Sequence, residues 1–179
     1  MEYEGEFLYD RKYNGKGYDE TGNIKYELLN GNGKVIEYNE YNELLFEGEY
    51  LNGIRNGKGK EYDEYYDLIF EGEFLNGKRN GQGKEYNSDG DIFFEGEYLN
   101  GKRWTGKGKD FNCDNNLIYE GGYLNGIWNG KGKEYNTYTG YLEFEGEYLN
   151  GQRHGKGKEY DEDGNVIFEG EYLNNNRIE

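Results

Sequence analysis

The sequence predicts an all-β fold, an elongated single-layer antiparallel meander of tandem β-hairpins. Three observations support this prediction. A pattern of one aromatic residue followed by Glu and Gly recurs through most of the 179 residues, at intervals of 24 or 25. Between its copies, apolar and polar residues alternate with the period of two that is typical of a β-strand. Gly is abundant, with 31 residues, whereas Ala and Pro are absent, which disfavours both long helices and a disordered chain.

The recurring pattern divides residues 1–179 into a single array of about 7.5 repeats. Complete copies start at Tyr3, Phe46, Phe70, Phe94, Tyr119 and Phe144. A short, degenerate copy starts at Tyr26, and the copy that starts at Phe168 is truncated. Because such an array stabilises itself through contacts between neighbouring repeats, a content of 33% hydrophobic residues is sufficient without a central core.

The repeat that starts at Phe70 shows how one hairpin is expected to form. In the first strand, Phe70, Gly72 and Phe74 share one face, because side chains of a strand alternate between its two faces. Residues 76–81 are predicted to form the turn, since Asn and Gly adopt positive φ at low cost. The second strand is then expected to cover residues 82–86.

Two further features of this repeat complete the expected hairpin. A tighter reversal toward the next hairpin is predicted at Ser88-Asp89-Gly90, because Asp-Gly between strands favours a short turn. Gly inside a strand normally weakens it, but an aromatic ring that lies over Gly72 or Gly83 recovers the lost packing. Contacts between rings and glycines are therefore expected to stabilise the sheet.

Twelve aromatic side chains, two from each regular repeat, are expected to lie on one face of the sheet. These candidate partner-binding residues are Phe46, Tyr50, Phe70, Phe74, Phe94, Tyr98, Tyr119, Tyr123, Phe144, Tyr148, Phe168 and Tyr172. One interpretation is that the rings pack only on the glycines and on one another. The other is that they form an apolar strip, rimmed by charge, that receives a helix or strand of a partner protein. The two interpretations are compatible.

The composition limits the possible partners and the location of the protein. A net charge of −16 opposes binding to nucleic acid and to anionic lipid, and it favours a basic or amphipathic protein segment. No run of about 18 apolar residues is present, and the first five residues (MEYEG) form an acidic segment where a signal peptide would be basic and then apolar. A membrane span and a signal peptide are therefore not expected. The chain is therefore predicted to be cytoplasmic. Cys113 is the only cysteine, which excludes an internal disulfide and a thiolate zinc site.

No catalytic, cofactor-binding or metal-binding residues are predicted, and the protein is expected not to be an enzyme. Carboxylate pairs such as Glu71 and Glu73 recur in five or more repeats, whereas catalysis needs one constellation. These pairs are expected to face Lys residues of neighbouring strands. His154 is the only histidine, so no catalytic triad or histidine metal cluster is available. The acidic segment 161–165 lacks the spacing of a calcium-binding loop.

The end of the array carries two more expectations. Because the chain stops after the strand at residues 168–173, no appended catalytic domain is expected. The last strand leaves one edge without a neighbour, which predicts self-association into a homo-oligomer.

Residues 46–62 (FEGEYLNGIRNGKGKEY) and 144–158 (FEGEYLNGQRHGKGK) resemble the MORN repeat. The resemblance extends over essentially the whole chain. It implies a single-layered ladder of β-hairpins with a scaffold or adaptor function, in which a groove often holds a partner segment. It also implies an alternative, because members of this family have been linked to phospholipid or membrane association. Three departures from the pattern are the short copy at Tyr26, Trp104-Thr105 in place of the usual Asn, and Gly122 in place of the second Glu.

Overall fold

The computed structural model describes residues 2–178, and all regular secondary structure in that range is β-strand. The chain forms two compact units. The first contains the residues up to Ile92 together with Glu97–Lys102, and the second contains Phe93–Gly96 together with the residues from Arg103 onward. The strands of the first unit are β1 (Glu2–Leu8), β2 (Arg11–Tyr18), β3 (Ile24–Leu28), β4 (Gly33–Tyr38), β5 (Leu44–Leu51), β6 (Ile54–Tyr62), β7 (Leu68–Leu75) and β8 (Lys78–Tyr86). Strand β9 (Ile92–Leu99) contributes residues to both units.

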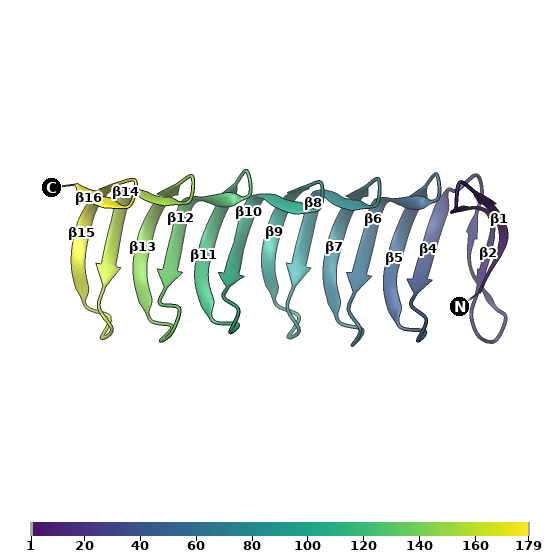
Figure 1. Cartoon of the computed structure of the whole chain (residues 1–179), viewed down its shortest axis with the longest axis horizontal. Helices are drawn as coiled ribbons and strands as arrows, with labels where there is room; N and C mark the ends of the chain where they lie inside the picture. Colours follow the sequence, from purple (N-terminus) through teal and green to yellow (C-terminus); the bar gives the residue numbers. More distant parts are fainter. Residues whose placement is uncertain (1, 179) are drawn as a thin grey trace. The chain divides into compact units, whose positions relative to one another are not determined.

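The second unit repeats the same hairpin arrangement. Its strands are β10 (Lys102–Phe111), β11 (Leu117–Leu124), β12 (Ile127–Tyr135), β13 (Leu142–Leu149), β14 (Gln152–Tyr160), β15 (Val166–Leu173) and β16 (Asn176–Ile178). Strands β1–β3 form a three-stranded sheet, and β4–β16 follow one another in chain order in a thirteen-stranded antiparallel sheet (Figure 1). The predicted all-β fold of tandem antiparallel hairpins is confirmed.

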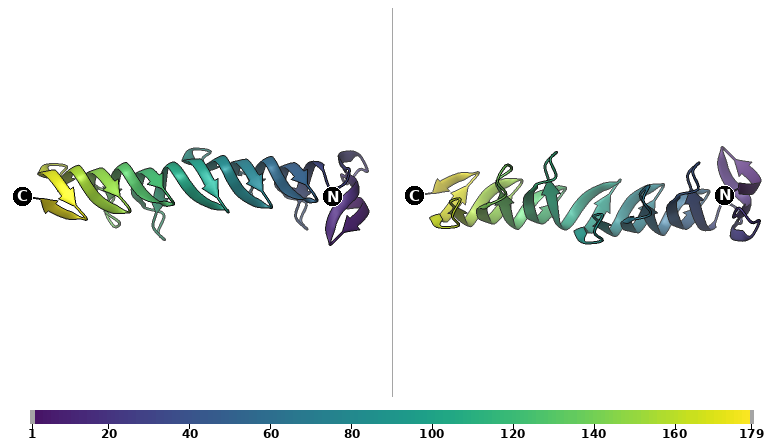
Figure 2. Two further views of the ribbon diagram at one scale, coloured as in Figure 1. Left: turned by 90° about the horizontal axis from the view of Figure 1, so that it is seen from above. Right: turned by 90° about the horizontal axis from the view of Figure 1, so that it is seen from below.

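Glycines lie opposite one another across the strands and fix the register of the pairing. In the first unit, Gly59 of β6 pairs with Gly48 of β5 and with Gly72 of β7. In the second unit, Gly146 of β13 pairs with Gly132 of β12 and with Gly157 of β14. Successive hairpins within each unit are therefore in the same register, and their strands lie side by side in the two views of Figure 2.

The turn inside each hairpin is shorter than the sequence predicted. Asn76 and Gly77 both have positive φ, 50° and 80°, and β8 begins directly after them at Lys78. Two residues with positive φ match the right-handed twist of the flanking strands and close a hairpin without further loop residues. The prediction of a turn over residues 76–81 is therefore wrong, and Arg79 belongs to a strand, opposite Phe74.

The loop that connects one hairpin to the next is longer than the turn inside a hairpin. The prediction of a tighter turn at Ser88-Asp89-Gly90 is therefore wrong. The side-chain oxygen of Asn87 accepts hydrogen bonds from the backbone N–H groups of Asp89 (3.1 Å) and Asp91 (2.8 Å). Asn side chains stabilise such loops by bonding their own backbone a few residues on. The five residues 87–91 thus form the loop between β8 and β9. In Figure 1 these loops lie at the lower ends of the strands and the two-residue turns at the upper ends.

Each two-residue turn is also bonded to the hairpin before it. In the first unit, the N–H of Gly77 donates to the carbonyl of Arg55 (2.9 Å), and that of Gly101 donates to Arg79 (2.8 Å). In the second unit, Gly151 donates to Trp128 in the same way (2.9 Å). These bonds join consecutive repeats at the edge of the sheet where the two-residue turns lie, in addition to the hydrogen bonds between paired strands.

The expected continuous pairing is interrupted at the short repeat. Between β3 and β4 only one isolated bridge, from Leu29 to Asn32, was found, and the two strands belong to different sheets. The short copy lacks about four central residues, so β3 and β4 are too short to continue the regular register. Tyr26, Leu28 and Val35 pack into a buried cluster at this place.

The face of the sheet opposite the aromatic rings carries the recurring Glu and Lys pairs, and we call it the charged face. Lys60 of β6 lies opposite Glu47 of β5 and Glu71 of β7. In the second unit, Lys158 lies opposite Glu145 and Glu169, and its Nζ atom is 3.2 Å from Glu169. The prediction that the Glu pairs face Lys residues is confirmed, although exposed pairs of this kind contribute little to stability.

Candidate partner-binding face

Most of the twelve predicted rings are buried within the face that they form, which we call the ring face. Ten of them are between 0 and 6% exposed: Phe46, Phe70, Phe74, Phe94, Tyr98, Tyr119, Tyr123, Phe144, Tyr148 and Tyr172. Tyr50 and Phe168 are partly exposed. The rings therefore account for the core of each unit, and their role in binding a partner stays a prediction.

Glycines form the floor under the rings, as the sequence predicted. A Cβ atom added to Gly83 would lie 2.6 Å from the ring of Phe70, and one added to Gly72 would lie 2.7 Å from it. No side chain larger than hydrogen fits at such distances. The rings also contact one another edge to face, with centroids 5.4 Å apart for Phe70 and Phe74 and 5.0 Å apart for Phe70 and Tyr98.

An arginine covers the opposite side of the first ring in most regular repeats. The guanidinium of Arg79 lies 4.2 Å from the ring centroid of Phe70, and that of Arg55 lies 4.2 Å from Phe46. In the second unit, Arg153 covers Phe144 at 4.4 Å. Each of these rings is thus held between a glycine floor and a guanidinium group, an arrangement that combines apolar burial with a cation–π contact.

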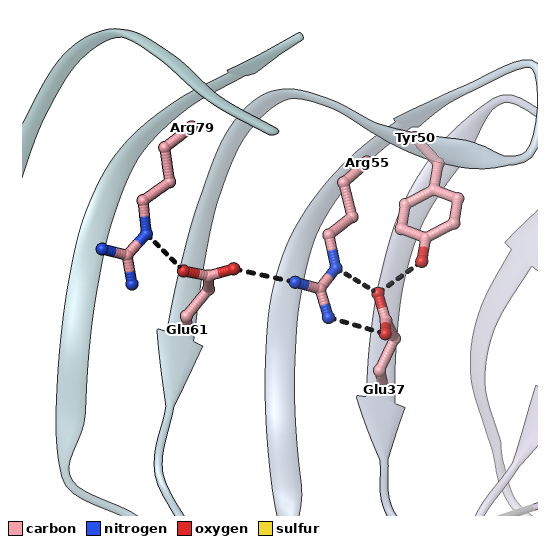
Figure 3. A network of polar contacts seen from close by, with 5 residues as sticks. All are labelled: Glu37, Tyr50, Arg55, Glu61 and Arg79. Carbon is pink, nitrogen blue, oxygen red and sulfur yellow. Dashed lines mark hydrogen bonds and ion pairs between the residues drawn. The ribbon is translucent and has the colours of Figure 1, made fainter. Parts of the chain in front are cut away.

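These arginines alternate with glutamates along the ring face of the first unit. Arg55 binds Glu37 through Nε (2.8 Å) and Glu61 through Nη1 (2.8 Å). Arg79 binds the other oxygen of Glu61 through Nε (2.6 Å) and Glu85 through Nη1 (2.6 Å). We call these five residues the first charge ladder. Figure 3 shows how Glu61 is shared between the two guanidinium groups.

A second charge ladder lies on the ring face of the second unit. Its members are Glu134, Arg153, Glu159 and Arg177. Arg153 binds Glu134 through Nε (3.0 Å) and Glu159 through Nη1 (3.2 Å), and Arg177 binds the other oxygen of Glu159. Charge-assisted bonds of this kind fix the orientation of both partners.

The two charge ladders lower the pKa values of carboxylates within them. Burial acts to raise the pKa of Glu37, but hydrogen bonds from Arg55 and from the Tyr50 hydroxyl outweigh it, and the pKa is lowered below its ordinary value. The pKa of Glu159 is lowered in the same way, because the bond from Arg177 outweighs the effect of burial. Both carboxylates are therefore ionised at neutral pH.

The repeat that starts at Tyr119 replaces the arginine with Trp128. The indole ring stacks on Tyr119, with centroids 4.1 Å apart and an angle of 4° between the planes. Its Nε1–H donates to the carboxylate of Asp110 (2.6 Å), which occupies the position that Glu61 holds beside Arg79. The hydroxyl of Tyr119 donates to the carbonyl of Gly122 (3.0 Å).

The arginines, the shared glutamates and Trp128 are parts of this face that were not predicted from the sequence. Arg79 falls within the predicted turn of residues 76–81, because Asn80-Gly81 is a second turn signal after Asn76-Gly77. With a turn of two residues, Arg79 falls on the same face as Phe74, and the period of two would have revealed the cover over Phe70.

Residues 2–178 contain no helix with the length and apolar character needed to cross a lipid bilayer. Within the same range, no group of three or more His, Cys, Asp or Glu residues is placed to hold a metal ion.

Comparison with protein families finds a match to a model described as MORN repeat. The matched segments are residues 46–64, 70–92, 119–137 and 144–166. Comparison with curated proteins finds no relative. The matched segments contain the aromatic, glycine and basic residues that build the ring face of both units.

Proposed function

The chain is a MORN-repeat protein, and on this premise we propose that it is a non-enzymatic, cytoplasmic scaffold that binds a protein segment along its ring face. MORN repeats are known in scaffolds that bind proteins or membranes, and they are typically non-catalytic. The proposal for this chain goes further, because it selects a protein partner and one face of the sheet.

The charge ladders carry the proposal. The side chains of Glu61 and Arg79 are 18% and 22% exposed, so they present charged atoms to solvent from fixed positions. Because two strands separate one repeat from the next, equivalent groups recur roughly every 10 Å along the face. A partner segment meets an ordered row of guanidinium and carboxylate groups, held in place by rigid rings, and binding requires little further ordering.

Because most of the rings are buried, they limit which side chains a partner can touch on the ring face. Since Phe70 is 0% exposed beneath Arg79, a partner touches the charge ladder and the partly exposed rings such as Tyr50, and the buried rings act as the floor. The net charge of −16 favours a segment with an excess of basic residues, because electrostatic attraction increases the rate of association.

Neutralising one ion pair on each face tests the proposal. Glu61→Gln/Arg79→Gln removes charges from the ring face while the amides retain hydrogen-bonding capacity, and Glu47→Gln/Lys60→Gln removes a matched pair from the charged face. Each variant and the unchanged chain are crosslinked in cell extract, and the captured proteins are quantified by mass spectrometry. We expect the ring-face variant to lose at least half of the specific capture and the charged-face variant to keep it.

The same variants also distinguish binding of a protein partner from the alternative, association with a membrane. Flotation with liposomes of neutral and anionic lipid is measured in parallel with crosslinking. Flotation of the unchanged chain without any protein capture would replace the protein-binding proposal with membrane association. Equal loss of capture in both variants would show that the partner does not distinguish the two faces.

A further inference from the structure

The Tyr119 repeat differs from the Phe46 and Phe144 repeats in the number of guanidinium groups that its glutamate receives. Glu61 binds the two guanidinium groups of Arg55 and Arg79, and Glu159 binds those of Arg153 and Arg177. In each pair, the first arginine lies six residues before the glutamate on the same strand.

Trp128 occupies the place of that first arginine before Glu134. Both residues belong to β12, and they have the spacing of Arg55 and Glu61 on β6. The indole reproduces the stacking of an arginine on the ring beneath it and the bond to the preceding carboxylate, here Asp110. It has no group that corresponds to the second guanidinium arm, which binds the glutamate on its own strand.

Glu134 consequently accepts hydrogen bonds from fewer guanidinium groups than Glu61 and Glu159 do. Arg153 and the hydroxyl of Tyr148 both donate to its Oε2 atom, each at 3.0 Å. Among residues 2–178, no side chain donates a hydrogen bond to its Oε1 atom. Its side chain is 28% exposed, compared with 18% for Glu61 and 16% for Glu159. Trp128 is itself partly exposed on the same face.

We propose that Trp128 and Glu134 bind one guanidinium group that the partner protein supplies from an arginine. This inference rests on the proposed function, because it requires the partner to lie along the ring face. The guanidinium stacks on the indole and donates to Oε1 of Glu134, so that this glutamate receives two guanidinium groups, as Glu61 and Glu159 do. The planar, delocalised group of arginine suits this combination of an aromatic face and a carboxylate better than the compact ammonium of lysine does.

The chain itself supports this assignment at equivalent positions. Arg55, Arg79 and Arg153 each combine an aromatic ring, at 4.2 to 4.4 Å, with the glutamate six residues later on their own strand. The proposed site offers the same two elements, an aromatic surface and a carboxylate oxygen, without the arginine. An arginine from outside then makes in trans the contacts that the other repeats make within the chain.

A small-molecule titration tests the site without knowledge of the partner. The ¹⁵N-labelled chain is titrated with N-acetyl-arginine methylamide and, separately, with the uncharged isostere N-acetyl-citrulline methylamide. The signals followed are the indole N–H of Trp128, assigned with a Trp104→Phe variant, and the backbone amide of Glu134. We expect saturable shifts with the arginine derivative only. Glu134→Gln is expected to weaken binding about fivefold, whereas the control variant Glu169→Gln, which removes a carboxylate that pairs with Lys158 on the charged face, leaves it unchanged.

Trp128→Arg provides a second test, which does not depend on the folding of the Glu134 variant. It supplies the guanidinium within the chain, so the Glu134 amide should no longer respond to the arginine derivative. Equal shifts with citrulline, equal affinity in Glu134→Gln, or an unchanged response in Trp128→Arg would each overturn the inference. Since no partner is present in this titration, its failure leaves the scaffold proposal intact, and a loss of partner capture leaves this binding intact.

Discussion

The repeats that start at Phe70 and at Tyr119 cover equivalent pairs of glycines with different sets of side chains. Phe70 lies over Gly72 and Gly83 and is covered by Arg79. Tyr119 lies over the equivalent glycines of its own repeat and is covered by Trp128. Both repeats have an aromatic ring over two glycines, Phe in one and Tyr in the other, but the side chain that covers the ring and the carboxylate that binds this cover differ.

This difference separates the packing of a cover on the ring from the formation of ion pairs, which a single residue provides in the Phe70 repeat. Arg79 both packs on the ring and joins two carboxylates, whereas Trp128 packs on the ring and donates one hydrogen bond. The ring and its glycine floor are retained in both repeats, and the ion pairs are not. We infer that the packing of rings is essential to each repeat, while the charge ladder is a surface property that varies along the chain.

Removing a ring tests the retained element and should have the largest effect. Phe70→Ala is expected to lower the free energy of unfolding by about 3–5 kcal/mol, because it deletes a fully buried ring and exposes its glycine floor. Tyr119→Ala should cost a similar amount. Urea unfolding gives the total loss, and hydrogen exchange of the neighbouring strands localises it. A loss below about 1 kcal/mol in either variant would contradict the common role of the rings.

Exchanging the covers tests whether they are equivalent. Arg79→Ala is expected to cost about 1–3 kcal/mol, because Phe70 loses its cover and Glu61 loses one guanidinium. Arg79→Trp, which copies the Tyr119 repeat, should cost less than Arg79→Ala in the same urea experiment. If the two variants are equally unstable, packing of the cover on the ring contributes nothing.

The charge ladders predict a dependence of stability on pH. The pKa values of Glu37 and Glu159 are lowered in the folded protein, so the folded state binds fewer protons than the unfolded state near the ordinary value of about 4.5. The ladder therefore contributes stability above that pH, and this contribution is lost as the pH falls through the lowered pKa values. Thermal unfolding between pH 7 and pH 3 should show the loss, and Glu37→Gln should flatten the profile. A profile identical to that of the unchanged chain would remove Glu37 as a cause.

The loops that precede the two repeats allow the finest comparison. Tyr66 has a φ of 68° at a position where the loop before Tyr119 has Asn115, with a φ of 62°. Asn tolerates this conformation better than Tyr does, so Tyr66→Asn is expected to stabilise the chain by about 0.5–1 kcal/mol in urea unfolding. Tyr65→Asn serves as the control, because Tyr65 is also exposed but does not have positive φ, and it should give no gain.

The sequence predicts the hairpins and the contacts of rings with glycines because both depend on periodicity. Phe70, Gly72 and Phe74 share a face in any antiparallel pairing, and the glycine of the facing strand follows from the repeat length. The length of the turn could not be predicted in this way, because two Asn-Gly signals compete within residues 76–81. That error placed Arg79 outside the strand and hid the charge ladder.

The interruption of the sheet could not be predicted from the local pattern either. The short copy at Tyr26 keeps its aromatic residue and its Asn-Gly turn, so its missing residues suggest only a shorter hairpin. Whether the sheet is interrupted depends on whether β4 pairs with β3 or only with β5. This pairing is decided by tertiary packing and not by the local sequence. The buried cluster of Tyr26, Leu28 and Val35 is visible only once that pairing is known.

The bonds from each turn to the hairpin before it determine where the chain tolerates changes in length. Gly77 can reach Arg55, and Gly151 can reach Trp128, only if the strands between them keep a fixed number of residues. The loops at the other edge vary in length: the loop that begins at Asn136 closes on Tyr141 with one residue more than the loop from Asn87 to Asp91. This longer loop still accepts hydrogen bonds from Asn112 and Asn116 of the loop before it, through the carbonyl of Thr137. During evolution, insertions should therefore accumulate at the loop edge, while growth of the array proceeds by duplication of whole repeats.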